Sequence, residues 1–279
     1  MNENTVAETF DAKLSKQRCL KFRRRMLDIS QTVTALHLAG AFSCIEIVDC
    51  IYNGLMRRDE EGKSVDTFLL SKGHGSLAQY VVLEDLGVLP RTELDRFCQP
   101  GCILGTHPDF GIPGIEAATG SLGHGLPITV GMALADKVQG NDRVIYVVLS
   151  DGELQEGSTW EAMMLAPSLG LRNLVAVVDL NDFQSLGRTS EIFPNFYPVL
   201  EKVSAFGWET VEVDGHDQQA IFDAVSSRKG NAPMMVIART IKGKGVSYME
   251  SVPIWHYRSP SPEEYQQALA ELAGAEEKV

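Results

Sequence analysis

The stretch Val144–Ala162, VIYVVLSDGELQEGSTWEA, gives the strongest indication of the fold. Its first residues form a continuous apolar run rich in β-branched side chains, and the run ends abruptly at Ser150. Continuous rather than alternating apolarity is typical of a strand that is covered on both faces, as in a parallel sheet. The stretch therefore predicts a buried strand that leads into a helix through a loop with three carboxylates, Asp151, Glu153 and Glu156.

Two more apolar runs, Leu174–Asp179 and Met234–Ala238, have the same character and also end in polar residues. Helical patterns lie between the runs, at Ser158–Leu169 and Gln218–Ser226, and DTFLLSKGH at residues 66–74 predicts a shorter strand. Strands that alternate with helices indicate an α/β protein with a doubly wound, mainly parallel sheet and helices on both faces.

The rest of the chain adds helices and one long loop. Helical spacing of apolar residues predicts helices at Lys13–Ile29, Ser43–Met56 (with Ser43 as N-cap), Ser76–Leu86, Leu126–Lys137 and a terminal helix within residues 261–279. Residues 98–125 are rich in glycine and proline, which predicts a long ordered loop. We expect one domain over residues 1–279, with a helical extension over residues 1–30.

Composition and charge exclude several classes of partner. The chain has 279 residues, of which 44% are hydrophobic, and a formal net charge of −12. Nonspecific binding to nucleic acid or anionic membranes needs a basic surface, so neither is expected. No signal peptide is visible, and no apolar run approaches the roughly 20 residues that span a bilayer. The five cysteines form no CxxC pair, and we expect small buried thiols in a reducing cytoplasm.

Polar groups follow two of the predicted strands at their carboxyl ends, where open parallel sheets bind ligands. Asp151 follows one strand, and Asn181 and Phe183 follow the next. If these strands are neighbours, Asp151 lies beside Asn181. A carboxylate oxygen, an amide oxygen and the backbone carbonyl of Phe183 form an oxygen-only ligand set that suits Mg²⁺, with Ca²⁺ as a substitute. Gly152 would let a diphosphate approach the backbone.

The surrounding motifs carry a family resemblance. LSKGHGSLAQY, GTHPDFGIPGIEAATGSLGHGLPITVGMALA, DGELQEGSTWEA and IKGKGVSYMESVPIWH occur in this order, together with the asparagine of DLNDFQ. They resemble the N-terminal, diphosphate-binding half of transketolases over roughly Arg25 to Pro262. The resemblance implies the thiamine diphosphate-binding fold, thiamine diphosphate and Mg²⁺ as cofactors, and Asp151, Asn181 and Phe183 as metal ligands.

The same resemblance implies roles for the histidines. His74 corresponds to a contact of the cofactor diphosphate, and His107 to a residue that binds the hydroxyls of the donor substrate. His256 corresponds to a contact of the diphosphate that also assists proton transfer. His37 is expected in the active site, although the segment LHLAGAFS around it departs from the family pattern. Imidazoles suit such work because they both donate and accept protons near neutral pH.

Other positions complete the expected site. The resemblance places Gly120 and Leu122 around the cofactor rings, His124 close to the cofactor, and Glu156 near the cofactor and the subunit interface. His37, His107, His256 and Glu156 form the expected catalytic group, and His74, Gly120, Leu122, His124, Gly152, Asn181 and His256 the expected cofactor contacts.

Four features lie outside these roles. Glu153 is expected to be a solvated loop carboxylate and His216 a structural or surface residue. The segment IKGKG lacks the spacing of a phosphate-binding loop and is expected to be a strand-end loop before His256. Ser150 replaces the first glycine of the family's GDG sequence, which is tolerable if the backbone there does not need a positive φ.

Full-length transketolases continue for several hundred residues, and the glutamate that activates the cofactor lies in their pyrimidine-binding domain. We find no substitute for it here, so we expect a separately encoded C-terminal-half subunit in an α₂β₂ assembly with the active site at the interface. The expected reaction moves a two-carbon ketol unit from a ketose to an aldose, each a sugar or sugar phosphate.

Two alternatives remain open. The altered segment LHLAGAFS also suits a thiamine diphosphate-dependent synthase that joins a 2-oxo acid to an aldehyde in an acyloin-forming reaction. A non-catalytic scaffold that binds the cofactor is the other alternative.

Overall fold

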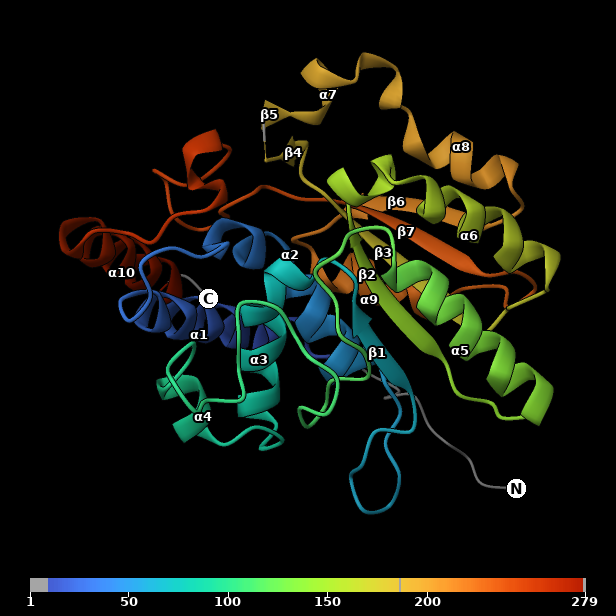
Figure 1. Cartoon of the computed structure of the whole chain (residues 1–279), viewed down its shortest axis with the longest axis horizontal. Coiled ribbons are helices and arrows are strands. Elements are labelled where there is room, and N and C mark those ends of the chain that lie inside the picture. Colours follow the sequence, from blue (N-terminus) through green and yellow to red (C-terminus); the bar gives the residue numbers. More distant parts are fainter. Residues whose placement is uncertain (1–9, 186, 278–279) are drawn as a thin grey trace.

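A five-stranded parallel sheet forms the centre of the computed structural model, which describes residues 10–185 and 187–277 (Figure 1). The strand order is β1-β2-β3-β7-β6, and each neighbouring pair is parallel. The strands are β1 Thr67–Leu70, β2 Ile145–Ser150, β3 Leu174–Leu180, β6 Glu209–Asp214 and β7 Met234–Arg239. A separate antiparallel pair joins β4 (Phe183–Gln184) to β5 (Gly187–Arg188).

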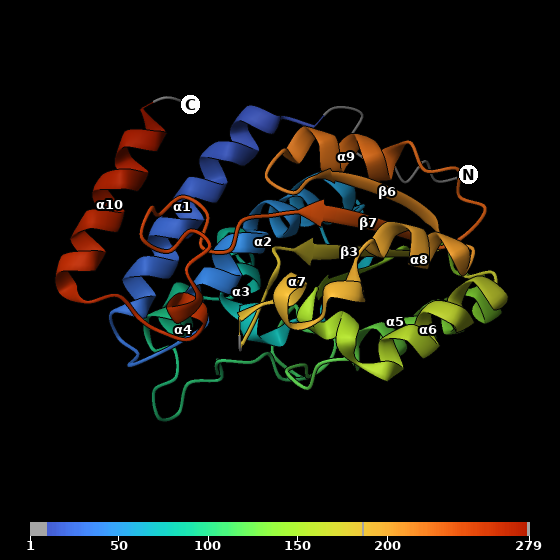
Figure 2. The ribbon, with the colours of Figure 1, turned by 90° about the horizontal axis from the view of Figure 1, so that it is seen from above.

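Helices cover both faces of the sheet, as Figure 2 shows, which confirms the predicted α/β fold class. One hydrophobic core joins a face of the sheet to α1 Ala12–Ser30, α2 Leu38–Cys50, α3 Ser76–Asp85, α9 Gln218–Ser226 and α10 Pro262–Glu276. A second core joins the other face to α5 Gly125–Gln139, α6 Gly157–Ser168 and α8 Val199–Ala205. The short elements are α4 Arg91–Asp95, η1 Ile51–Leu55, η2 Gly73–Gly75, η3 Gly152–Gln155, α7 Thr189–Ile192, η4 Pro194–Phe196 and η5 Pro253–His256.

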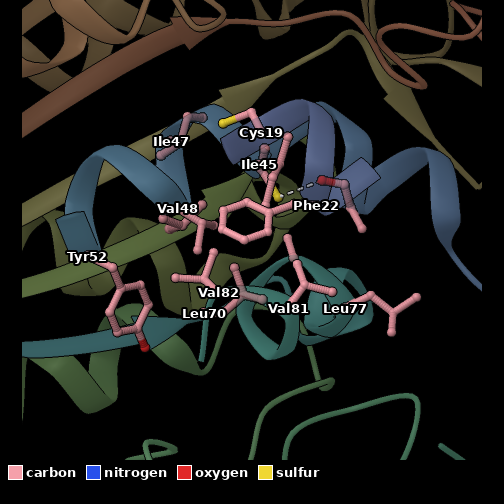
Figure 3. Packing of buried hydrophobic residues seen from close by; sticks show 14 of the residues in the cluster. Cys19, Phe22, Ile45, Ile47, Val48, Tyr52, Leu70, Leu77, Val81 and Val82 are labelled. Atoms are coloured by element: carbon pink, nitrogen blue, oxygen red, sulfur yellow. Dashed lines mark hydrogen bonds between the residues drawn. The ribbon is translucent and has the colours of Figure 1, made fainter. Parts of the chain in front are cut away.

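The two cores explain why the central strands are continuously apolar. In β2, Tyr146 and Val148 belong to the first core, whereas Val147 and Leu149 belong to the second. Successive side chains of a strand point to opposite faces, so a strand between two helical layers needs an apolar residue at every position. Figure 3 shows the first core, in which Phe22 of α1 lies among side chains of α2 and α3.

Helix α2 begins earlier than predicted. It starts at Leu38 with His37 at the N-cap, and every residue from Leu38 to Cys50 is buried. The prediction that Ser43 caps this helix is therefore wrong, because Ser43 lies inside it and donates a hydrogen bond to Asp179 (Oγ–Oδ1 2.6 Å). A helix that is buried all round has no polar face to mark its first turn.

The edge strand β6 was not predicted. Its sequence, ETVEVD, alternates charged and apolar side chains, and none of its residues is buried. Such a pattern is typical of a strand at the border of a sheet rather than its centre, and it differs from the continuous apolar runs that predicted the other strands.

One stretch has the length and composition of a membrane span, contrary to the expectation that none comes close. Leu38–Leu55 covers 18 residues with a mean hydropathy of 1.3, but 94% of it is buried inside the fold. These residues form the core helix α2 and the short π-helix η1 that follows it.

The expectation of buried thiols holds for three of the five cysteines. Cys19, Cys44 and Cys50 are buried, whereas Cys102 is partly exposed and Cys98 is exposed. The last two lie in the long loop after α4.

Candidate active site

A cavity of about 360 Å³ opens at the carboxyl edge of the sheet. Residues that follow β1, β2, β3 and β7 meet there, as expected for an open parallel sheet. The lining comprises His37, Gly40, Lys72, His74, His107, Gly120, Leu122, Ser150, Gly152, Gln155, Glu156, Asn181, Phe183, Gln184, Ser185, Lys242 and His256. Most of the predicted site residues therefore share one cavity.

Asp151 lies between two residues of the cavity wall, Ser150 and Gly152, and is fully buried. Its Oδ1 accepts a hydrogen bond from the backbone N–H of Gly152 (2.9 Å), and its Oδ2 has no partner among the described residues. Burial, followed by the nearby Asp179, raises the pKa of Asp151 to about 7. A bound cation would satisfy the free oxygen and stabilise the charged carboxylate.

Asn181 directly follows the neighbouring strand β3, which pairs with β2 in parallel register. The prediction that Asp151 and Asn181 follow adjacent strands is confirmed. The Nδ2 of Asn181 donates to Ser43 Oγ (3.0 Å) and Asp179 Oδ2 (3.3 Å), while its Oδ1 accepts from Phe183 N (3.0 Å). These bonds fix which way the amide faces.

The donor set fits a hard cation. No group of three or more His, Cys, Asp or Glu side chains suited to a metal occurs within residues 10–185 and 187–277. A metal here would rely on the free oxygen of Asp151, the amide oxygen of Asn181 and a backbone carbonyl, the oxygen ligands that Mg²⁺ prefers together with phosphate oxygens.

A buried ion pair lies behind Asn181. Lys72 Nζ contacts Asp179 Oδ2, donates to the carbonyl of Gly40 (2.9 Å), and is 1% exposed. Burial alone lowers the pKa of Lys72, but the charge of Asp179 outweighs it and the net pKa is raised. Asp179 also accepts from Ser43, Asn181 and Thr240, so four side chains donate to it.

Four histidines gather around the cavity. The ring of His37 lies 5.1 Å from those of both His74 and His256 and 6.4 Å from that of His107, measured between centroids. Burial, followed by His107 and Lys242, lowers the pKa of His37 to about 4. Burial and Lys242 lower the pKa of His256 to about 3, and burial lowers that of His74 well below its usual range. These three rings are therefore neutral at pH 7.

The lowered pKa of His37 predicts an acid-sensitive fold. The unfolded chain binds a proton at His37 near pH 6.5, the folded chain only near pH 4, so the free energy of unfolding falls as the pH drops through this window. We expect urea unfolding at pH 7 and pH 5 to show a smaller loss of stability for His37→Asn than for the unsubstituted chain. An equal loss of stability in both proteins would contradict the conclusion that folded His37 is neutral in this pH range.

Gly120 is required by its backbone and by its neighbour. Its φ is +140°, and a Cβ at this position would lie 2.7 Å from Cδ2 of His107. A side chain here would be strained and would displace His107 from the cavity. His124, by contrast, is exposed at the N-cap of α5 and is not part of the cavity wall.

A family model for the thiamine diphosphate-binding domain of transketolase matches residues 15–265. This chain belongs to the transketolase family. It is 38% identical to an apulose-4-phosphate transketolase subunit of Phocaeicola vulgatus, over 93% of this chain and 94% of that relative. It is also 38% identical to a 6-deoxy-6-sulfo-D-fructose transketolase subunit of a Clostridium species, over 85% of this chain and 88% of that relative.

Solved transketolases share the fold over a longer chain. The transketolase of Campylobacter jejuni superposes with a TM-score of 0.87 at 26% identity, over 95% of this chain but only 43% of that one. The transketolase of Leishmania mexicana gives 0.85 at 26% identity, over 95% and 42%. The chain thus spans less than half of these transketolases and nearly all of the P. vulgatus relative.

The serine that departs from the family's GDG sequence is accommodated without strain. Ser150 is the last residue of β2, and the described non-glycine residues with positive φ are Cys98, Asp182 and Ser251. Position 150 therefore needs no glycine. The hydroxyl of Ser150 accepts a long hydrogen bond from Glu153 N (3.4 Å).

The expectation that Glu153 is a solvated loop carboxylate is wrong. Its side chain is buried, and its Oε1 accepts from the hydroxyl of Ser71 and from the N–H of Gly123 (3.0 Å). Burial raises the pKa of Glu153, and its hydrogen bonds only partly offset this. Glu153 therefore joins the loop after β2 to the end of β1 and to the loop that carries Gly120 and Leu122.

We expect Glu153→Ala to lower the free energy of unfolding by about 1–3 kcal/mol, because it leaves a buried hydroxyl and a buried N–H without partners. The matched control is Glu161→Ala, an exposed carboxylate on α6, with an expected change within about 0.5 kcal/mol. Urea unfolding of both variants measures the difference. If both variants changed the free energy of unfolding by similar small amounts, Glu153 would be a solvated carboxylate after all.

Two cavity cations were not predicted from the sequence. Lys72 and Lys242 line the cavity, yet within SKGH only His74 was assigned a role, and IKGKG was expected only to be a strand-end loop. Lysines beside a strand end at a predicted diphosphate site are the signal that could have found them. The hydrogen bonds of His216 were not predicted either: its Nε2 accepts from Ile241 N (2.8 Å), and its Nδ1 lies 3.2 Å from Oε2 of Glu46.

Proposed function

We propose that this chain is the diphosphate-binding subunit of a two-chain transketolase that moves a two-carbon ketol unit from a ketose donor to an aldose acceptor. The observation that carries the proposal is the free, buried Oδ2 of Asp151 at the edge of a cavity ringed by neutral histidines. Three relatives of similar length are named as transketolase subunits, which supports a separate partner chain.

Mg²⁺ would be held by Asp151, Asn181 and the carbonyl of Phe183, and the diphosphate by the metal, Gly152, His74 and His256. Bound thiamine diphosphate supplies the nucleophilic carbon that accepts the ketol unit. The chain's own residues orient it: Gly120 permits the backbone to approach, and Leu122 supplies an apolar wall.

Imidazoles carry the proton transfers in this proposal. The neutral ring of His37 would accept hydrogen bonds or protons from the donor hydroxyls, and His107 would contact the same hydroxyls. His256 would exchange a proton near the diphosphate end of the cavity. Glu156 is exposed at the cavity mouth, where the partner chain would meet it in an α₂β₂ assembly.

The donor is proposed to be a ketose with an anionic substituent. The relatives are named for apulose 4-phosphate and 6-deoxy-6-sulfo-D-fructose, which share a phosphate or sulfonate group. Lys72 and Lys242 are buried and engaged with Asp179 and His256, so recognition of that anion is assigned to the partner chain.

The test uses this chain together with a candidate C-terminal-half subunit, thiamine diphosphate and Mg²⁺. We expect consumption of a ketose phosphate only when an aldose acceptor is present, and no carbon dioxide from pyruvate. Carbon dioxide release from pyruvate with an aldehyde acceptor would instead favour the acyloin-forming synthase. A complex that binds no thiamine diphosphate would contradict the proposed cofactor site.

A further inference from the structure

The loop after β7 carries Lys242 into the cavity and is held at several points. Gly243 N donates to the carbonyl of Ala39 on α2 (2.9 Å), and Thr240 N donates to that of Leu180 (3.1 Å). Between them, Ile241 N donates to Nε2 of His216 (2.8 Å). A side chain from the turn after β6 therefore supplies the acceptor next to Lys242.

The hydrogen bond from Ile241 determines the protonation of His216. Because Nε2 accepts a hydrogen bond, the ring proton of a neutral His216 must lie on Nδ1. That nitrogen lies 3.2 Å from Oε2 of Glu46, to which it donates. The side chains of His216 and Glu46 are 12% and 7% exposed, so the pair is shielded from water.

Glu46 is held in turn by α1. Arg23 donates to both of its oxygens, at 2.6 and 2.8 Å. Burial raises the pKa of Glu46, but Arg23 and His216 outweigh this effect and the net pKa is about 2. Glu46 is therefore a charged acceptor at neutral pH, and it holds His216 in the Nδ1–H tautomer.

The same reasoning applies to the next residue of the loop, Lys242. Nζ of Lys242 lies 2.7 Å from Nδ1 of His256, and Lys242 is 5% exposed. An ammonium group can only donate, so Nδ1 of His256 accepts and the ring proton lies on Nε2. The pKa of Lys242 is lowered to about 8 by burial and by Lys72, which leaves it charged at pH 7.

We propose that His216 is a positioning residue: its Nε2 fixes Ile241, and thereby sets Lys242 against His256 and selects the Nε2–H tautomer of His256. Arg23, Glu46, His216 and Ile241 form one hydrogen-bonded chain from α1 and α2 to the cavity wall. Outer groups that fix the tautomer of an active-site histidine affect its function strongly in other sites. The kinetic consequence rests on the proposed transketolase function, whereas the tautomers do not.

The first test is spectroscopic and needs no activity. In the ¹⁵N-labelled full chain at pH 7, His216 is expected to be protonated on Nδ1 only and His256 on Nε2 only, with a through-bond ¹⁵N coupling from Ile241 N to His216 Nε2. His216→Leu should remove that coupling and mix the His256 tautomers. His216→Gln should keep His256 on Nε2, because its amide oxygen accepts from Ile241 and its amide nitrogen donates to Glu46.

The second test is a double-mutant cycle on the enzyme with its partner. We expect His216→Leu to lower kcat by about 10-fold with KM for thiamine diphosphate nearly unchanged, and His216→Gln to restore most of the loss. Added to Lys242→Met, His216→Leu should cost little further activity, because both act through His256.

Three results would overturn the proposal: a His216 that is protonated on Nε2 in the unsubstituted chain, a His256 tautomer unaffected by His216→Leu, or fully additive losses in the cycle. If His216→Leu does not fold, two measurements still test the proposal: the coupling from Ile241 N to His216 Nε2 in the unsubstituted chain, and the tautomer of His256 in His216→Gln. If no ketol transfer is found, the spectra judge this proposal separately from the proposed function.

Discussion

Asp151→Ala is expected to abolish Mg²⁺-dependent binding of thiamine diphosphate. The carboxylate is fully buried and its Oδ2 has no partner in the described part of the chain, so a bound cation is what would satisfy it. Loss of groups that merely support metal ligands costs about 10- to 100-fold in metal affinity, and loss of the ligand itself should exceed about 100-fold. Calorimetric titration of the two-chain complex with thiamine diphosphate, with and without Mg²⁺, measures the effect.

The control for this substitution is Glu161→Ala, which removes an exposed carboxylate from the helix that follows the acidic loop. It should bind the cofactor as the unsubstituted complex does. If Asp151→Ala also bound normally, with the same dependence on Mg²⁺, the metal site would lie elsewhere.

Lys72→Met is expected to destabilise the chain by about 3–5 kcal/mol. The substitution keeps most of the apolar stem but removes the charge that faces Asp179, and a buried carboxylate left without its partner is costly by about this amount. Domains of ordinary stability unfold with about 5–15 kcal/mol, so the loss would be a large part of the total. Urea unfolding of the purified chain gives the value.

The matched control is Lys244→Met, two residues beyond Lys242. Lys244 lies 3.6 Å from Glu250, and both side chains are about one-third exposed. Exposed ion pairs contribute at most about 1 kcal/mol, so this variant should unfold near the midpoint of the unsubstituted chain. Equal effects at the two lysines would mean that the Lys72–Asp179 pair contributes no more than a surface pair.

Periodicity was sufficient to predict the layers of the fold. The runs that became β2, β3 and β7 are continuously apolar up to their polar ends because helices cover both faces of the sheet. The same reasoning placed Asp151 and Asn181 at the ends of neighbouring strands. Strand β6 was not predicted, because its polar, alternating sequence differs from the continuous apolar runs of the buried strands.

Burial of polar groups could not be predicted from local sequence. Glu153 lies in an acidic loop that looks solvated, yet Ser71 and Gly123, both distant in sequence, cover it. The partners of Asp179 likewise come from the ends of β1 and β7 and from α2. Only the tertiary fold brings such groups together, so their positions became clear only in the structure.

The most direct test of the central claim is to mix this chain with a candidate for the C-terminal half and to measure mass and activity together. Light scattering should show a heterotetramer, and ketol transfer with thiamine diphosphate and Mg²⁺ should require both chains, each being inactive alone. Full ketol transfer by this chain alone would contradict the account, as would a stable heterotetramer that binds the cofactor and transfers no ketol unit from any ketose phosphate or sulfonate.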